Sequence, residues 1–268
     1  MELPDQTETQ GGWHPMTDEG FEAAWRAVAG VQGWLTRDQA RRIWTAVGRA
    51  GTDPVGRPPV FVEIGSFRGR SMIVAALAAG EDTELVAIDP HAGNDRGPGQ
   101  WHGTAGEGQG DHEAFWDNLG RAGVAGRVRH VRSFSSEAHG EVEGSVDVLY
   151  IDGAHRYGPA SADIRAWGAR VAPGGVMLIH DAFSSVGVTM ALMAHLVPSG
   201  EWTYEGRSGS MVQYRRMAPV GGDRMVGVAR QLASLGWFAR NLAVKTAIVA
   251  RLRPLARVLG HDGETWPY

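Results

Sequence analysis

Short apolar runs alternate with amphipathic segments along the middle of the chain. Five of the runs are predicted to be buried strands, because they are brief, mostly rich in Val, Ile or Leu, and bounded by polar or turn-forming residues. The segments between them repeat apolar residues every three or four positions, which is typical of amphipathic helices. The five runs are PVFVEIG (59–65), ELVAIDP (84–90), RVRHVRS (127–133), VDVLYID (146–152) and GVMLIHD (175–181).

Alternating strands and helices predict a mostly parallel sheet with helices on both faces. Two further strands are expected in EWTYEGRSGSMVQYRRM (201–217), on either side of a tight turn at Arg207–Gly209. The prediction is therefore an α/β fold: a doubly wound, Rossmann-like, seven-stranded sheet whose last strand is antiparallel.

Extensions flank this predicted core on both sides. Residues 1–12 are polar and predicted to be disordered, and 13–57 should form a helical extension and a linker, with Thr36 as a helix N-cap. The core is assigned to residues 58–218. Residues 219–268 should form a helical tail that breaks or kinks at Pro254.

Composition excludes several classes of site. The 268 residues are 43% hydrophobic and 21% charged, as in ordinary globular proteins, and none is cysteine. A disulfide framework, a zinc–thiolate site and a cysteine nucleophile are thereby excluded. The N-terminal residues lack the charged and apolar regions of a secretory signal, and no segment has the apolar length of a membrane span. These features favour a cytoplasmic protein.

Positive charge is concentrated in the tail. The formal net charge is −4, yet Arg224–Gly260 holds seven of the 26 basic residues and none of the 30 acidic ones. Such a helix either lies on an anionic membrane surface or packs against its own domain or a second copy of the chain, as in a homo-oligomer. Nucleic-acid binding is not expected, because the rest of the chain is acidic. The apolar positions that share one helical face are Leu235, Phe238, Leu242, Val249 and Leu252.

Carboxylates gather at the ends of the predicted strands. In doubly wound sheets ligands bind beyond the carboxyl ends of the strands. Four of the five strand ends here carry an acidic residue, and this clustering is the main functional signal in the sequence. The four residues are Glu63, Asp89, Asp152 and Asp181.

The turn VEIGSFRGRS follows the first strand and opens a helix. Gly65 and Gly69 would let the backbone pass close to a ligand, and Asp89 lies about twenty residues further on, where an acid often accepts ribose hydroxyls. The spacing is G-x-x-x-G, not the G-x-G-x-x-G of dinucleotide-binding folds. The turn could also be a plain strand-to-helix connector.

With VEIGSFRGRS and VAIDP, the chain resembles class I S-adenosylmethionine-dependent methyltransferases over residues 60–216. Glu63 matches the acidic start of their first motif, and the closing hairpin resembles their reversed seventh strand. The resemblance implies S-adenosylmethionine as cofactor, with Asp89 on the ribose hydroxyls and Ser135 near the adenine. The full implied cofactor set is Glu63, Gly65, Ser66, Phe67, Gly69, Asp89, Ser135 and Asp152.

The stretch IDGAH resembles the D-x-x-H motif of magnesium-dependent O-methyltransferases that act on macrolide sugars. In those enzymes the aspartate binds metal and the histidine is the general base, which implies these roles for Asp152 and His155. Their next strand ends in Glu-Asp, whereas this chain has His180-Asp181. The metal ligands are therefore expected to be Asp152, Asp181 and His180, with Mg²⁺ as the divalent ion. As alternatives, Asp152 caps a turn and the two histidines are packing residues.

These features predict an S-adenosylmethionine-dependent, metal-assisted O-methyltransferase that acts on a hydroxyl of a sugar or related small molecule. An NAD(P)-dependent oxidoreductase and a non-enzymatic cofactor-binding scaffold are the alternatives. The glycine-rich segment 91–110 is expected to be a loop that closes over the site, with Trp101 as a contact to substrate. The histidines in and just after it, His91, His102 and His112, are expected to be exposed.

Overall fold

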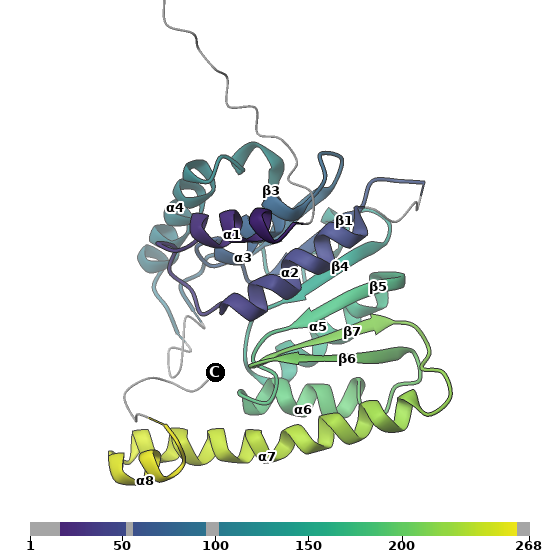
Figure 1. The fold of residues 1–268 in the computed structure, drawn as a ribbon. Helices are drawn as coiled ribbons and strands as arrows, with labels where there is room; N and C mark the ends of the chain where they lie inside the picture. Colours follow the sequence, from purple (N-terminus) through teal and green to yellow (C-terminus); the bar gives the residue numbers. More distant parts are fainter. Residues whose placement is uncertain (1–16, 52–55, 95–101, 262–268) are drawn as a thin grey trace, which may run out of the picture.

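The computed structural model describes residues 17–51, 56–94 and 102–261 of the chain (Figure 1). The predicted disorder at 1–12 and the predicted substrate contact of Trp101 lie outside the described residues.

The core is a seven-stranded sheet with strand order β3-β2-β1-β4-β5-β7-β6. The pairs from β3 to β5 are parallel, whereas β7 is antiparallel to both β5 and β6. This confirms the predicted Rossmann-like sheet and its reversed last strand. The strands are β1 (Val60–Ile64), β2 (Glu84–Ile88), β3 (Val128–Val131), β4 (Val146–Ile151), β5 (Val171–Ile179), β6 (Trp202–Ser208) and β7 (Met211–Arg216).

Helices cover both faces of the sheet (Figure 1). One hydrophobic cluster joins α1–α4 to the first face, and a second joins α5, α6 and α7 to the other. Successive residues of β1 enter opposite clusters, as the two-residue period of a strand requires: Phe61 belongs to the first and Val62 to the second. The helices are α1 (Asp18–Ala27), α2 (Arg37–Ala50), α3 (Arg70–Ala78), α4 (Ala105–Arg121), α5 (Tyr157–Ala166), α6 (Val186–His195), α7 (Asp223–Val249) and α8 (Arg253–Val258), with 3₁₀ turns at Ala125–Arg127, Ala138–Glu141 and Gly168–Arg170.

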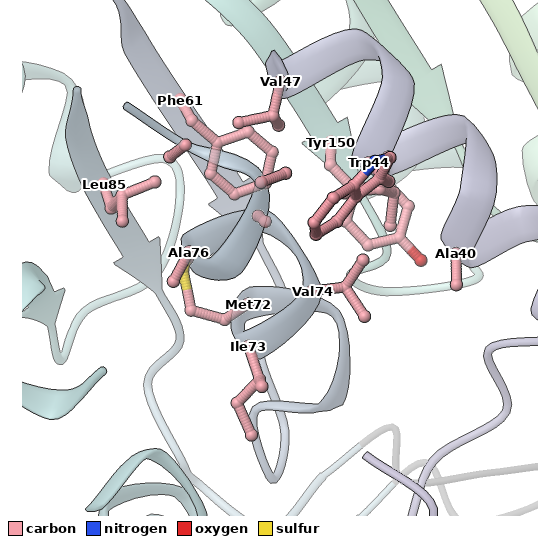
Figure 2. Close-up of a cluster of buried hydrophobic side chains, with 14 of the residues drawn as sticks. Ala40, Trp44, Val47, Phe61, Met72, Ile73, Val74, Ala76, Leu85 and Tyr150 are labelled. Carbon is pink, nitrogen blue, oxygen red and sulfur yellow. The ribbon is translucent and has the colours of Figure 1, made fainter. Parts of the chain in front are cut away.

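The N-terminal helix α2 packs into the first cluster beside α3 (Figure 2). Trp44 of α2 and the fully buried Tyr150 of β4 belong to this cluster. The helix begins where the sequence predicts, because the Thr36 side chain accepts a hydrogen bond from the backbone N–H of Gln39. The Gln39 side chain in turn accepts one from the backbone N–H of Thr36, which completes a capping box. The capping box thus fixes the start of α2, and Trp44 packs the helix into the first cluster.

The glycine-rich segment is not a loop over its whole length. Helix α4 begins at Ala105, because Thr104 and Glu107 form a capping box. A Cβ atom at Gly108 would lie 1.9 Å from the backbone oxygen of His91, so glycine allows this helix to approach the chain after β2. The prediction of an irregular segment up to residue 110 was therefore wrong for residues 105–110.

The basic tail forms α7, which runs along β6 and α6 (Figure 1). Trp237 and Phe238 pack against the second hydrophobic cluster, and the buried Gln231 accepts a hydrogen bond from the hydroxyl of Tyr214. The helix thus packs against its own domain, while contact of its outer side with a membrane or a second copy stays a prediction. Among the described residues, no helix has the length and apolarity needed to cross a bilayer.

Candidate active site

A cavity of about 1060 Å³ lies at the carboxyl ends of β1, β2, β4 and β5. This is where a doubly wound sheet places its ligands. Eight of the predicted site residues line it. They are Gly65, Phe67, Asp89, Ser135, Asp152, His155, His180 and Asp181.

The turn after β1 needs its glycines. Gly65 and Gly69 have φ angles of +84° and +85°, in the left-handed region that side chains disfavour. A Cβ at Gly65 would lie 2.3 Å from the backbone oxygen of Asp152, and one at Gly69 would lie 2.6 Å from Leu119 Cδ1. The turn therefore passes against β4 and α4 with no room for a side chain.

Asp89 holds this turn in place. Its Oδ2 accepts a hydrogen bond of 2.8 Å from the backbone N–H of Phe67, and its Oδ1 accepts one of 2.7 Å from that of His91. Each carboxylate oxygen has capacity for a further donor. Asp89 thus shapes the cavity floor and also presents acceptors toward the cavity.

Three of the residues that the resemblance placed around the cofactor lie behind the cavity wall. Ser66 and Gly69 are buried in the turn, and Glu63 is 0% exposed, with its carboxyl accepting a hydrogen bond from the Ser71 hydroxyl. Burial raises the pKa of Glu63 to about 8, partly offset by hydrogen bonds from serine hydroxyls. Their visible role is to support the turn from below.

Ser135 lines the cavity near a carboxyl that the sequence analysis missed. Its hydroxyl donates a 2.6 Å hydrogen bond to Asp163 Oδ1, from helix α5. Burial raises the pKa of Asp163 to about 6, against the lowering effect of that hydrogen bond. Asp163 lies mid-helix, away from the strand ends, so strand-end reasoning could not find it.

Two aspartates and two histidines converge at the ends of β4 and β5. Their neighbouring strands bring them together: the backbone N–H of His180 donates to the carbonyl of Ile151, one residue before Asp152. His155 Nε2 lies 2.6 Å from Asp181 Oδ2. His180 Nδ1 lies 3.2 Å from Asp152 Oδ1 and 3.3 Å from Asp181 Oδ2.

The cluster has the spacing and chemistry of a metal site. One ligand atom from each of Asp152, His155 and Asp181 lies within 4.8 Å of the others. Carboxylate and imidazole groups together bind divalent transition metals, and carboxylates alone suit Mg²⁺. The residues present therefore fit a divalent cation.

Buried neighbours fix the conformation of this cluster. The hydroxyl of Tyr150 donates a 2.9 Å hydrogen bond to Asp152 Oδ2, and burial raises the pKa of that phenol well above its usual range. Asp181 has a φ of +57°, and its carbonyl accepts hydrogen bonds from the N–H groups of Ser184 and Ser185. A strained backbone of this kind is typical of functional sites.

Within the cluster, charges and hydrogen bonds shift the pKa values of the side chains in the opposite direction to burial. Burial alone would raise the pKa of Asp181, but the charge of His180 and the hydrogen bond from His155 lower it well below its usual range. Burial lowers the pKa of both histidines, but the aspartates outweigh it and the net pKa is raised for His155 and well raised for His180. The two histidines and Asp181 thus stabilise one another's charged forms against the cost of burial.

The histidines of the glycine-rich segment were only partly predicted. His102 is exposed, as expected, but His91 is only 4% exposed and His112 is half-buried, so the prediction was wrong for these two. The rings of His91, His112 and His130 form a triangle with centroids 5.0–5.2 Å apart, packed against Phe115. Burial, together with nearby His91, His112 and Arg132, lowers the pKa of His130 to about 4, and the visible role of the three rings is packing.

The tail helix forms part of the cavity wall, which the sequence analysis also missed. Leu242, Lys245 and Val249 line the cavity from α7. Lys245 Nζ donates to the backbone oxygen and the hydroxyl of Ser184, at 2.8 and 3.1 Å. Lys245 is the only lysine in a chain with 26 basic residues, but its local sequence pattern does not indicate this contact. Apolar wall residues from other segments include Trp34, Tyr157, Val186 and Met190.

Comparison with known proteins identifies the central part of the chain. Residues 62–182 match the protein family described as "Methyltransferase domain". Over 137 residues the chain is 33% identical to protein y4gI of Sinorhizobium fredii. That match covers 47% of this chain and only 13% of the relative.

Solved structures share the fold at low sequence identity. The O-methyltransferase TomG of Streptomyces achromogenes, solved with S-adenosylmethionine, has a TM-score of 0.51 and 17% identity, covering 76% of this chain and 91% of that one. The methyltransferase PaMTH1 of Podospora anserina, bound to S-adenosylhomocysteine, has a TM-score of 0.53 and 16% identity, covering 82% and 99%. Residues 62–182 thus match a methyltransferase domain family, and the strand order and these solved structures show that the chain has the fold of such enzymes.

Proposed function

We propose that the chain is a metal-assisted O-methyltransferase that acts on a hydroxyl of a sugar or related small molecule. The observation that carries the proposal is the convergence of Asp152, His155, His180 and Asp181 on the wall of the cofactor cavity. Asp152 directly follows the strand that packs against the Gly65 turn, so the reacting groups lie next to the predicted cofactor site.

Methyl transfer from a sulfonium needs alignment and a good nucleophile. In the proposed reaction the acceptor oxygen bonds to the methyl carbon, the carbon–sulfur bond breaks, and S-adenosylhomocysteine leaves. The hydroxyl proton passes to a ring nitrogen of His155, which Asp181 orients through the 2.6 Å contact. Asp152, Asp181 and His180 would hold the divalent metal, which when bound lowers the pKa of a coordinated hydroxyl.

The comparisons support methyl transfer over the alternatives. A methyltransferase family covers the cluster residues up to Asp181, which favours this reaction over hydride transfer to a nicotinamide. TomG is described as an O-methyltransferase involved in tomaymycin synthesis, and NovP, whose structure covers 74% of this chain at a TM-score of 0.51, as an O-methyltransferase. These descriptions support a hydroxyl as the acceptor group.

Binding and turnover test the proposal together. Calorimetry should detect S-adenosylmethionine binding to the full chain. A panel of glycosylated and hydroxylated small molecules, assayed for S-adenosylhomocysteine release, should identify an acceptor. Chelation with EDTA should abolish the release and added Mg²⁺ or Mn²⁺ should restore it. Absence of cofactor binding would overturn the proposal, and full activity in EDTA would remove the metal from it.

Two partner predictions accompany this function. A homo-oligomer is expected, and light scattering coupled to gel filtration measures it. Contact of α7 with an anionic membrane is the second, and liposome co-sedimentation measures it. Reversing the charge of Arg251 and Arg257 in the full chain should release the protein from phosphatidylserine vesicles if the tail binds them.

A further inference from the structure

Gln39 of the N-terminal extension lies behind the metal cluster. It is 1% exposed and belongs to α2, which precedes the segment that matches the methyltransferase family. Its side-chain oxygen, Oε1, lies 3.3 Å from Nε2 of His180. A helix that the sequence assigns to an accessory extension therefore contacts the buried side of a candidate metal ligand.

The orientation of the Gln39 amide is fixed by its other partners. Oε1 accepts a 2.8 Å hydrogen bond from the backbone N–H of Thr36, which can only donate. The amide nitrogen donates to the backbone oxygen of Ser208 at 3.4 Å and to the hydroxyl of Ser210 at 3.2 Å. An oxygen facing His180 accepts, so Nε2 of His180 must carry a hydrogen.

With the hydrogen on Nε2, the other ring nitrogen of His180, Nδ1, faces the cluster. Nδ1 lies 3.2 Å from Asp152 Oδ1 and 3.3 Å from Asp181 Oδ2. Adjacent ligands of a six-coordinate metal with bonds of about 2.0–2.2 Å are about 3 Å apart. The nitrogen and the two oxygens thus have nearly the spacing of three neighbouring ligands.

We propose that Gln39 is a positioning residue that presents His180 Nδ1 as a nitrogen ligand, so that the site prefers a transition-metal dication to Mg²⁺. The inference rests on the proposed function, because it concerns the metal of the same site. Mg²⁺ favours an all-oxygen shell, whereas imidazole favours ions such as Co²⁺, Ni²⁺ and Zn²⁺. Partners behind a metal-bound histidine commonly fix its tautomer in this way.

The test compares metal binding in the metal-free full chain. CoCl₂ and MgCl₂ are titrated by calorimetry into the wild type, Gln39→Met, Gln39→Glu and His180→Glu. The wild type should bind Co²⁺ more tightly than Mg²⁺. Gln39→Met should weaken Co²⁺ binding about ten- to a hundredfold, the usual effect of losing such a partner. Gln39→Glu keeps the acceptor oxygen and should restore most of the affinity, and His180→Glu should shift preference toward Mg²⁺.

A matched control separates positioning from general destabilisation. Gln231→Met also removes a buried glutamine, 3% exposed, but from α7, where Gln231 bonds to Tyr214. It should leave Co²⁺ affinity unchanged. In addition, the proton spectrum of the Co²⁺ form should contain a strongly shifted, exchangeable imidazole N–H signal from His180. That signal should disappear in His180→Glu and exchange faster in Gln39→Met.

The outcomes distinguish this inference from the proposed function. Equal or tighter binding of Mg²⁺, or an unchanged Co²⁺ affinity in Gln39→Met, overturns the inference while the methyltransferase proposal stands. If the wild type lacks S-adenosylmethionine binding, the proposed function fails whatever metal binds. The absence of the shifted N–H signal in a Co²⁺-loaded wild type overturns the role of His180 as a ligand.

Discussion

Gly65 and Asp152 lie so close that a single methyl group would not fit between them. A Cβ atom at Gly65 would come within 2.3 Å of the Asp152 backbone oxygen. The two residues follow neighbouring parallel strands, where Ile64 of β1 pairs with Ile151 of β4. The turn expected to hold the methyl donor and the strand end that carries the candidate metal ligands are therefore one packed unit.

Gly65→Ala should disrupt both halves of this unit. The φ of +84° is unfavourable for alanine, and the added atom must displace either the turn or Asp152. We expect at least a tenfold loss of S-adenosylmethionine affinity by calorimetry, with a smaller loss in melting temperature. The control is Gly120→Ala in α4, where nothing lies within 4 Å of the added atom. Unchanged affinity in Gly65→Ala would show that the turn does not contact the cofactor.

His155→Gln should separate chemistry from binding. Loss of a general base costs about 10²–10⁴-fold in the rate of proton-coupled steps. The rate constant for methyl transfer should fall within that range, while the affinity for S-adenosylmethionine stays within about twofold. The exposed His102→Gln serves as control and should retain full activity. A variant at His155 with near-normal turnover would favour the non-enzymatic or packing interpretation of this residue.

Much of the fold could be predicted because local signals agreed with one another. The short apolar runs were recognised as buried strands, and successive residues such as Phe61 and Val62 of β1 enter opposite cores. Thr36 was identified as an N-cap because capping is encoded within four residues. The start of α4 was missed because six glycine-rich positions hid a capping box at Thr104. Weak helix propensity was overcome by that cap and by close packing against the chain after β2.

Only those residues of the candidate site that lie at strand ends could be predicted from the sequence. Asp152 and Asp181 converge because parallel strands deliver their ends to one edge. Asp163, Gln39 and Lys245 reach the same region from helices, and nothing in the local sequence pattern specifies which helix face meets the cavity. Such residues depend on long-range packing, which a single sequence does not reveal.

Glu63→Gln should change how stability depends on pH. Burial raises the pKa of Glu63 from 4.5 to about 8 in the folded protein. Because the folded state then holds the proton more tightly than the unfolded state, the contribution of Glu63 to the free energy of unfolding is full below about pH 4.5 and is lost as pH rises to about 8. At about 1.4 kcal/mol per pKa unit, the loss is about 5 kcal/mol.

The glutamine variant lacks this titration and should show a flatter profile. Urea unfolding at pH 5 and pH 8.5 measures the difference: the wild type should lose stability relative to Glu63→Gln at the higher pH. Glu113→Gln, at an exposed position of α4, should follow the wild type at both values. Parallel profiles for the wild type and Glu63→Gln would mean that the buried carboxyl does not hold its proton in this range.

Val249→Asp should affect the acceptor and spare the methyl donor. Val249 lines the cavity from α7 although it is 74% exposed, so its contact is with the mouth and not with the strand ends that form the cofactor half. Binding an apolar part of the acceptor against the aspartate would remove water from its carboxylate, which costs free energy. We therefore expect the acceptor KM to rise about tenfold, with the affinity for S-adenosylmethionine unchanged.

Val258→Asp is the matched control, because Val258 of α8 is 83% exposed and does not line the cavity. If both variants have wild-type KM, α7 is a structural support and not part of the acceptor site. A rise in KM for Val249→Asp alone would assign acceptor selectivity to a helix that lies outside the matched methyltransferase segment.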